Sequence, residues 1–324
     1  SSTARQSDER EMVDVMEVTP MMQKYLETKK EYPDCILFYR LGDFYEMFFD
    51  DAITVSKELE LTLTGKDCGQ EERAPMCGVP FHAAETYINR LVSNGHKVAI
   101  CEQMEDPKLA KGIVKREVIK VVTPGTNLNA QALDETKNNY LFCIYYQGDV
   151  IGVSICDFST GDYFVTELKS ENELIDEINK FVPSEIIVNE YFAMSGIDLT
   201  AVNEKLNISM STLENWYFDE DSSIKKLLSH FKISALDGLG VKDYPTGIIA
   251  AGALLTYLYE TQKSDMSHII TLTPYTTGKY MLIDSSSRRN LELVETLREK
   301  QKRGSLIWVL DKTKTAMGAR ALRS

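Results

Sequence analysis

The run Gly42-Asp43-Phe44-Tyr45-Glu46 brings together side chains that can recognise stacked rings. An aromatic side chain held on an exposed turn can act as a wedge, because a rigid ring that enters a stack forces its members apart. The carboxylate of Glu46 can accept a hydrogen bond beside such a ring or, when protonated, donate one. These residue types at this spacing therefore allow a site that binds stacked rings by separating them.

The flanking sequence must position Phe44. An apolar strand-like run, 35–40, precedes it, and a helical pattern follows it as far as about Leu59. Asp43 suits a helix N-cap, and Glu46 stands three residues later, which is the spacing of a capping box. The sequence therefore predicts a strand, a turn and a helix in that order, with Phe44 on the first, exposed turn of the helix.

A second interpretation buries Phe44. Apolar residues recur at 3- and 4-residue steps along the same predicted helix and would form one core-facing stripe. They are Phe44, Phe48, Ala52, Val55 and Leu59. The pattern alone favours this stripe over a wedge, and it leaves both interpretations open.

Length and composition are those of a globular protein with several domains. The 324 residues predict two or three domains, and 43% hydrophobic with 26% charged residues is an ordinary composition. No run of eighteen apolar residues occurs, so we expect no membrane span, and the polar N-terminus points to the cytoplasm. The six cysteines form no C-x-x-C pair, which favours free thiols, several of them buried, over a zinc site or disulfides.

The net charge of −13 is unusual for a chain that binds phosphate groups, since Lys and Arg supply most non-specific affinity for nucleic acid. Residues 17–130 carry 14 Lys and Arg against 18 Asp and Glu, residues 131–260 carry 8 against 21, and residues 261–324 carry 12 against 6. The first segment has a basic run, for which a solvated loop is the commoner role: Lys108, Lys111, Lys115, Arg116 and Lys120. We therefore expect any contact with nucleic acid outside the acidic middle segment.

Four blocks of sequence resemble, in the same order, the mismatch-recognition region of the MutS family of DNA mismatch-repair sensors. The first contains the Phe-x-Glu element of that family as Phe44-Tyr45-Glu46. The blocks are Leu37 to Glu46 followed by Asp50-Asp51-Ala52, then Ala74 to Ala83, Val98 to Gln103, and Val121 to Thr126. A lone Phe-x-Glu carries no information, but four ordered blocks within about ninety residues are specific. The resemblance extends from about Val18 to the end of the chain.

This resemblance implies that the chain binds duplex DNA and recognises mismatches and small insertion or deletion loops. Phe44 would be inserted as a wedge, and Glu46 would contact the base. Arg116, Lys66 and Lys108 would contact the DNA backbone, where guanidinium and ammonium groups bind phosphate oxygens.

Met76 would pack near the lesion or, equally, in the protein core. The implied partners are mismatched duplex DNA, a second MutS subunit in the full-length protein, and MutL through the middle domain. No membrane partner is implied.

The resemblance also implies an α/β fold class with three domains. Residues 17–130 would form a mixed α/β mismatch-recognition domain, and 131–260 a ribonuclease-H-like α/β connector domain. Residues 261–324 would begin an α-helical core, or lever, domain, and 1–16 would be a disordered or added N-terminal segment. Because a helical pattern is unfinished at residue 324, we expect the chain to be a piece of a longer protein.

Periodicity predicts the elements within these domains. In the first domain it predicts helices from Met21 to about Lys30 and from Ala83 to Asn94, and strands at 35–40, 61–64, 97–102 and 117–122. In the second, three β-rich runs separated by polar turns between 139 and 168 predict an antiparallel meander.

The alternative function is a metal-dependent nuclease of ribonuclease-H type that uses Asp157. This residue lies on the second strand of the predicted meander. Metal-dependent phosphoryl chemistry needs several converging carboxylates, and the sequence shows no evident partner. A role for Asp157 in a turn is therefore favoured.

We expect no enzyme activity and no cofactor for this chain. It lacks a phosphate-binding G-x-x-x-x-G-K-[ST] loop, and its four histidines are scattered. By resemblance, full-length relatives would be ATPases that bind ATP and Mg²⁺ through a C-terminal domain, in a cytoplasmic, nucleoid-associated protein.

Overall fold

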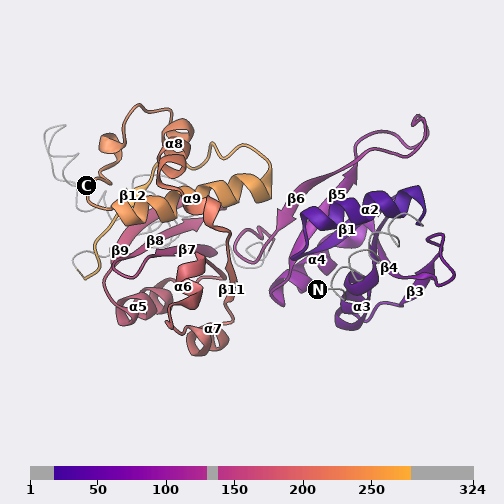
Figure 1. Cartoon of the computed structure of the whole chain (residues 1–324), viewed down its shortest axis with the longest axis horizontal. Helices are drawn as coiled ribbons and strands as arrows, with labels where there is room; N and C mark the ends of the chain where they lie inside the picture. Colours follow the sequence, from indigo (N-terminus) through magenta and orange to yellow (C-terminus); the bar gives the residue numbers. More distant parts are fainter. Residues whose placement is uncertain (1–17, 130–137, 279–324) are drawn as a thin grey trace, which may run out of the picture. The chain divides into compact units, whose positions relative to one another are not determined.

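The computed structural model describes residues 18–129 and 138–278, which form two compact units (Figure 1). Among the described residues, unit 1 comprises 18–127 together with Leu258–Ser264, and unit 2 comprises 128–129, 138–257 and 265–278. Each unit contains one six-stranded mixed sheet with helices, so the predicted α/β class is confirmed. The predicted tail at 1–16 and the predicted helices after residue 284 lie outside the described residues.

Unit 1 is built on a sheet with the strand order β3-β4-β2-β1-β5-β6. β1 and β5 are parallel, and the other neighbouring strands are antiparallel. The strands are β1 (Cys35–Leu41), β2 (Phe44–Phe48), β3 (Thr64–Lys66), β4 (Ala74–Pro80), β5 (Lys97–Gln103) and β6 (Arg116–Val122).

Helices cover the two faces of this sheet unequally. Helix α2 (Pro20–Glu31) lies on one face, while α3 (Phe49–Leu59) and α4 (Ala84–Ser93), which follows the short helix η1 (Phe81–Ala83), lie on the other (Figure 1). Successive side chains of a strand point to opposite faces. Phe38 of β1 therefore packs in the α3 and α4 core, and its neighbour Tyr39 packs with Met22 and Tyr25 of α2.

The segment that follows Gly42 is a hairpin strand, so the predicted helix beginning near Phe44 is wrong. Leu41 pairs with Phe44 across the loop Gly42-Asp43, and helix α3 begins only at Phe49. Gly42 has φ +60°, and a positive φ at the first residue of a two-residue loop is the type II′ pattern of tight hairpins. Asp43 is therefore a hairpin residue and does not cap the helix.

The predicted apolar stripe is divided between two elements. Ala52, Val55 and Leu59 are buried on α3, and Phe48 is buried at the end of β2, but Phe44 is exposed. The apolar spacing fitted a helix by coincidence, because the segment from Phe44 alternates in burial with the period of a strand. The interpretation of Phe44 as a core residue is wrong.

The remaining elements of unit 1 follow the predictions with two exceptions. The strand predicted at 61–64 is displaced to β3, which begins at Thr64. Strand β4 was not predicted, because Pro75, Gly78 and Pro80 are residues that usually interrupt strands. It nevertheless pairs on both sides, with β3 and with β2.

Unit 2 has the strand order β11-β10-β7-β8-β9-β12. β7, β8 and β9 form the predicted antiparallel meander, and β10 and β11 run parallel to β7, which is the arrangement of ribonuclease-H-like folds. The strands are β7 (Tyr140–Tyr146), β8 (Ile151–Asp157), β9 (Asp162–Leu168), β10 (Glu185–Val188), β11 (Ser209–Thr212) and β12 (Thr273–Pro274).

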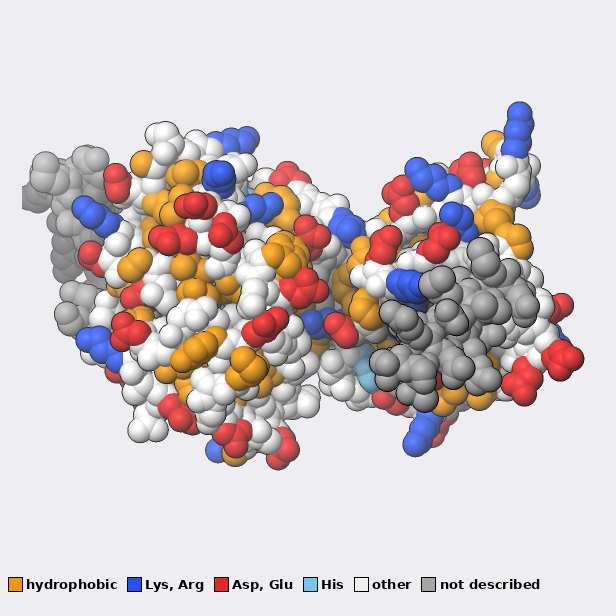
Figure 2. Space-filling view, in the orientation of Figure 1, with side chains coloured by type: hydrophobic (Ala, Val, Ile, Leu, Met, Phe, Trp, Pro, Cys, Tyr) orange, Lys and Arg blue, Asp and Glu red, His pale blue; other side chains and the backbone are white. Residues whose placement is uncertain are grey.

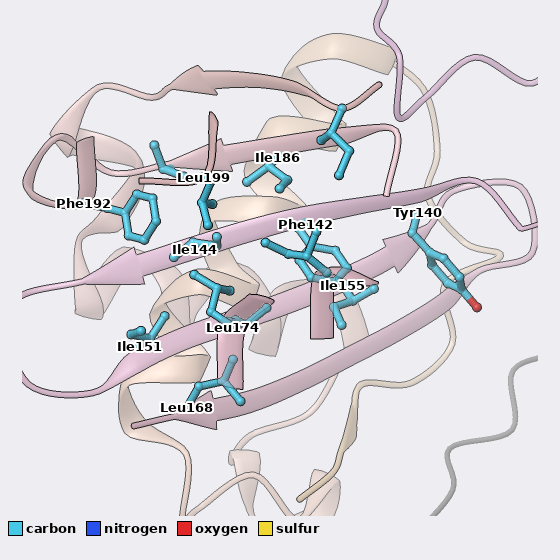
Figure 3. Close-up of a cluster of buried hydrophobic side chains, with 14 of the residues drawn as sticks. Tyr140, Phe142, Ile144, Ile151, Ile155, Leu168, Leu174, Ile186, Phe192 and Leu199 are labelled. Carbon is cyan, nitrogen blue, oxygen red and sulfur yellow. The ribbon is translucent and has the colours of Figure 1, made fainter. Parts of the chain in front are cut away.

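Helices pack on both faces of the unit 2 sheet. Those on one face, α5 (Glu171–Phe181), α6 (Glu190–Met194) and α7 (Thr200–Leu206), share a core with the strands in which Phe142, Ile155 and Leu174 are buried (Figure 3). The other face carries α8 (Glu220–Phe231) and α9 (Pro245–Gln262), and the short helices η2 (Asn215–Phe218) and η3 (Leu236–Leu239) complete the unit.

Helix α9 approaches β8 closely because Gly152 has no side chain. A Cβ at this position would lie 2.5 Å from the carbonyl oxygen of Thr246, which is closer than real Cβ atoms come to other atoms. The hydroxyl of Tyr163 on β9 also donates to the carbonyl of Ala251. The apolar character of α9 is therefore explained by burial within the protein.

All six cysteines are buried and unpaired, which confirms the prediction of free thiols. Burial raises the pKa of Cys77 to about 11 and that of Cys101 to about 12. The thiolate is the reactive form of cysteine, so these residues serve as small apolar side chains of the core.

Candidate nucleic-acid interface

Part of the α2 face of the unit 1 sheet remains exposed or half-buried, away from the buried contacts of the helix. Cross-strand partners share a face, so Phe44 and Glu46 of β2 lie on the same face as Gly78 of β4, and Gln103 of β5 lies on the same face as Arg116 of β6. We call this uncovered region the Phe44 surface. It comprises Leu41, Phe44, Glu46, Lys66, Met76, Gly78, Gln103 and Arg116, which are all exposed or half-buried.

Phe44 projects from this surface. Its side chain is 47% exposed, whereas Phe48, four residues further along the same face, is only 1% exposed. The neighbouring Tyr45 points to the opposite face and is buried in the α3 and α4 core. Phe44 is therefore an apolar ring presented to solvent on a paired strand.

Hydrogen bonds fix the hairpin that presents Phe44. The Arg40 guanidinium donates to the carbonyl of Gly42 over 2.6 Å and to Glu102 over 3.1 Å, and the Tyr45 hydroxyl also donates to Glu102. The amide of Gly42 donates to the side chain of Gln103 over 3.1 Å. These contacts join the hairpin to β5, so the hairpin is held from the neighbouring strand as well as by its own pairing.

The hairpin is also held from β4 and η1. The amide of Phe81 donates to the carbonyl of Asp43 over 2.9 Å, and the Arg40 guanidinium lies 3.9 Å from the centre of the Phe81 ring. A cation at this distance is attracted to the face of the ring. The loop Gly42-Asp43 is thus supported on two sides.

Glu46 forms an ion pair with Lys66, whose Nζ lies 2.7 Å from the Glu46 Oε2. The side chain of Lys66 is 30% exposed and that of Glu46 is 17% exposed. The structure therefore brings together two residues that the sequence had assigned to separate roles, one at the base and one at the DNA backbone.

Gly78 is a residue of this surface whose role the sequence did not reveal. It lies opposite Glu46, and a Cβ there would lie 3.2 Å from the carbonyl oxygen of Tyr45 and 3.8 Å from the Phe44 ring. A side chain there would press against the Tyr45 carbonyl and touch the Phe44 and Glu46 side chains at ordinary contact distance. A glycine within a strand signals such a close approach, and that signal was available in the block from Ala74 to Ala83.

Arg116 lies at the edge of the Phe44 surface and already makes internal contacts. Its guanidinium donates to the carbonyls of Arg40 over 2.7 Å and Val114 over 3.0 Å, and lies 5.2 Å from the centre of the Tyr39 ring. A guanidinium has five N–H donors, and a third donates to Gln103. Arg116 is therefore oriented by the protein and retains donors for a further acceptor.

The other predicted residues are placed differently. Met76 is half-buried on the Phe44 surface, where it packs at the edge of the α2 core. Lys108 is exposed in the loop between β5 and β6, outside this surface. The basic run does not form one strip: Lys115 pairs with Glu117, and Lys120 lies on the opposite sheet face from Arg116, where burial lowers its pKa.

Asp157 is a turn residue at the end of β8. Its buried carboxylate accepts hydrogen bonds from the amides of Asn139, Ser159 and Thr160, and from the Ser159 hydroxyl. Burial raises the pKa of this carboxyl. Its lone pairs are thus used within the protein, and no group of three His, Cys, Asp or Glu side chains that could hold a metal ion occurs among residues 18–129 and 138–278. The nuclease alternative is unsupported.

No helix in the described part of the chain is long and apolar enough to cross a membrane.

Comparison with known proteins identifies three successive matches. Residues 19–131 match the family description "MutS domain I", residues 139–270 match "MutS domain II", and residues 286–324 match "MutS domain III". These matches follow one another in the order of the domains and together take in most of the chain.

Curated relatives carry the same family name. The DNA mismatch repair protein MutS of Lachnoclostridium phytofermentans is 65% identical over 308 residues, which are 95% of this chain and 33% of the relative. The protein of the same name from Ruminiclostridium cellulolyticum is 55% identical over 309 residues, 94% of this chain and 35% of the relative. The chain spans about a third of the length of these relatives. These similarities, with the two α/β units, show that the chain belongs to the MutS family and carries sequence of its domains I, II and III.

Proposed function

We propose that this chain binds duplex DNA and recognises mismatched base pairs and small insertion or deletion loops, as part of a mismatch-repair sensor. Phe44 enters the stack of base pairs, and Glu46 beside it contacts the displaced base. The observation that carries this proposal is the exposed Phe44 ring, which stands on a braced hairpin strand at the centre of the Phe44 surface.

The free energy required to insert a ring between base pairs depends on how stable those pairs are. Unstacking a base step costs about a few kcal/mol, and the cost is lowest where the pair is already mismatched. A carboxylate such as that of Glu46 is repelled by the phosphates unless it makes a hydrogen bond with a base. The two residues together would therefore favour a mismatched site and disfavour an intact one.

The test is binding of this chain to two duplexes that differ in one base pair, one matched and one mismatched, at several salt concentrations. We expect tighter binding to the mismatched duplex at every concentration. Equal affinities, measured where both complexes are detectable, would contradict the proposal. A version extended to the length of the relatives provides the same comparison if the chain alone binds weakly.

Arg116 would contact a phosphate of the bound DNA. Replacing it with alanine should weaken binding to matched and mismatched duplexes by the same factor and reduce the slope of log affinity against log salt by about one. If only mismatched binding were lost, Arg116 would act through the Phe44 hairpin instead, because its guanidinium donates a hydrogen bond to the carbonyl of Arg40.

Unit 2 would bind a protein partner, and by family resemblance that partner is MutL. On the face in view, unit 2 carries Asp and Glu side chains interspersed with hydrophobic side chains (Figure 2). A pocket of about 270 Å³ is lined by residues that include Tyr145, Tyr191 and Met194. Met194 is 80% exposed, and Trp216, which follows a lining residue, is 53% exposed. Exposed aromatic and methionine side chains are typical of protein interfaces.

Replacing Trp216 with alanine should weaken binding to purified MutL by about tenfold or more if this patch is the interface, because buried Trp side chains often dominate binding energy. Surface plasmon resonance with immobilised MutL measures the change, and Phe44→Ala provides a control in unit 1. Unchanged MutL affinity of the Trp216 variant would place the interface elsewhere.

By family resemblance, the full-length protein would act as a dimer that binds ATP and Mg²⁺ through a C-terminal domain. This chain would contribute recognition of DNA without enzyme activity. A protein that binds DNA in this way would act in the cytoplasm, at the nucleoid.

A further inference from the structure

Lys66 reaches Glu46 across an intervening strand. Lys66 is on β3 and Glu46 on β2, and β4 lies between them in the sheet. On the shared face, β4 presents Ala74 opposite Lys66 and Gly78 opposite Glu46. The half-buried Met76, which pairs with Phe48, lies between these two small residues on the same face of β4, so the long Lys66 side chain passes it on the way to Glu46.

The ion pair is partly shielded from solvent. The Lys66 Nζ lies 5.7 Å from the centre of the Phe48 ring, in addition to its 2.7 Å contact with Glu46. A pair between fully exposed side chains contributes little, because both side chains are mobile and water screens the charges. Here the packing of the two strands restricts both side chains, so Glu46 has a defined partner before any ligand binds.

We propose that Lys66 is a positioning residue that controls how strongly Glu46 discriminates between intact and mismatched DNA; this inference rests on the function proposed above. In the pair, the positive charge of Lys66 offsets the repulsion between Glu46 and phosphates. The Lys66 Nζ holds the Oε2 of Glu46, so a hydrogen bond from this oxygen to a mismatched base would require the ion pair to break. Lys66 therefore favours binding to intact duplex and opposes the contact that signals a mismatch.

The effect of removing Lys66 consequently depends on Glu46. Without Lys66, Glu46 carries an uncompensated charge that weakens binding to matched DNA, and no ion pair has to be broken for Glu46 to contact a mismatched base. The ratio of mismatched to matched affinity should rise. If Lys66 only contacted a phosphate, its loss would weaken both complexes equally and leave the ratio unchanged.

The experiment is a double-mutant cycle with Glu46→Gln and Lys66→Met, measured as affinities for the matched and the mismatched duplex. We expect Lys66→Met alone to raise the affinity ratio by about fivefold, a coupling within the usual range for contacting residues. In the Glu46→Gln background, the same substitution should leave the ratio unchanged. Lys66→Arg, which keeps the positive charge, should retain the original ratio.

Lys108→Met is the matched control, since it removes the same charge from an exposed loop outside the Phe44 surface. It should leave the ratio unchanged in both backgrounds. Equal weakening of both complexes by Lys66→Met, whether or not Glu46 is present, would overturn the proposed role of Lys66. The function proposed above would fail in a different way, namely through equal affinities of the unsubstituted protein for both duplexes.

Discussion

Replacing Phe44 with alanine should abolish the preference for mismatched DNA and leave the protein folded. The ring is 47% exposed, so its removal leaves no internal cavity and should change the free energy of unfolding by less than about 1 kcal/mol. Affinity for the mismatched duplex should fall to that for the matched duplex, because the variant lacks the ring that we propose separates base steps. Fluorescence anisotropy with both duplexes, together with a thermal melt, measures the two effects.

Phe48→Ala is the matched control for this prediction. Phe48 is on the same strand and the same face but is 1% exposed, and it packs against Tyr25 at a ring-centre distance of 4.8 Å. Its replacement should cost about 3–5 kcal/mol of unfolding free energy. A large loss of stability for Phe44→Ala, with unchanged mismatch preference while the variant remains folded, would show that Phe44 belongs to the core.

Replacing Asp157 with alanine should destabilise unit 2 by about 2–3 kcal/mol, because three part-buried backbone amides lose the buried carboxylate that accepts their hydrogen bonds. Asp157→Asn should cost less, since the amide oxygen can still accept hydrogen bonds from Ser159 and Thr160. Asp149→Ala removes an exposed carboxylate from the preceding turn and should change stability by at most about 0.5 kcal/mol. Chemical denaturation measures all three variants.

The loss of unfolding free energy caused by Asp157→Ala should increase as the pH is lowered from 7. Burial raises the pKa of Asp157 in the folded chain, so the folded state holds this proton more tightly than the unfolded state. The stability that protonation contributes is fully present below the unfolded pKa of about 3.9 and is lost as the pH rises through the folded pKa. A loss that shrinks towards acid pH would contradict this assignment.

The same variants test the nuclease alternative. We expect no strand cleavage by the unsubstituted chain with Mg²⁺ or Mn²⁺, since the Asp157 lone pairs are engaged in the turn. Metal-dependent cleavage that disappears in a folded Asp157→Asn variant would restore that alternative.

The sequence predicted most strands and helices correctly but mispredicted the secondary structure around Phe44. Strands β1, β5 and β6 and the meander of unit 2 are short apolar runs bounded by turn residues, and such runs carry their own signal. A helix was wrongly predicted between Gly42 and Phe48 because the positions of Asp43 and Glu46 fit a helix start as well as a hairpin. Pairing with β1 and β4 decides between them, and that pairing is non-local.

The sequence named five of the residues on the Phe44 surface, together with Lys108, which lies outside it, but did not predict how they are arranged. Phe44, Glu46, Lys66, Met76 and Arg116 lie on one sheet face, which depends on the register of the strands that carry them. The sequence did not predict the Glu46–Lys66 pair, because the two residues are twenty positions apart and on strands that are not neighbours. It also did not predict that Arg116 would be engaged by Arg40.

The type II′ hairpin at Gly42-Asp43 would also affect how fast and how tightly the Phe44 ring enters DNA in the proposed function. A wedge carried on a mobile loop would lose conformational entropy each time it entered a base stack, and part of the contact energy would be spent on ordering the loop. Here the backbone of Phe44 is already ordered by β1 and β4. If Phe44 acts as proposed, inspection of each base step would require deformation of the DNA alone, and the protein would sample and leave intact steps rapidly without refolding the hairpin that carries Phe44.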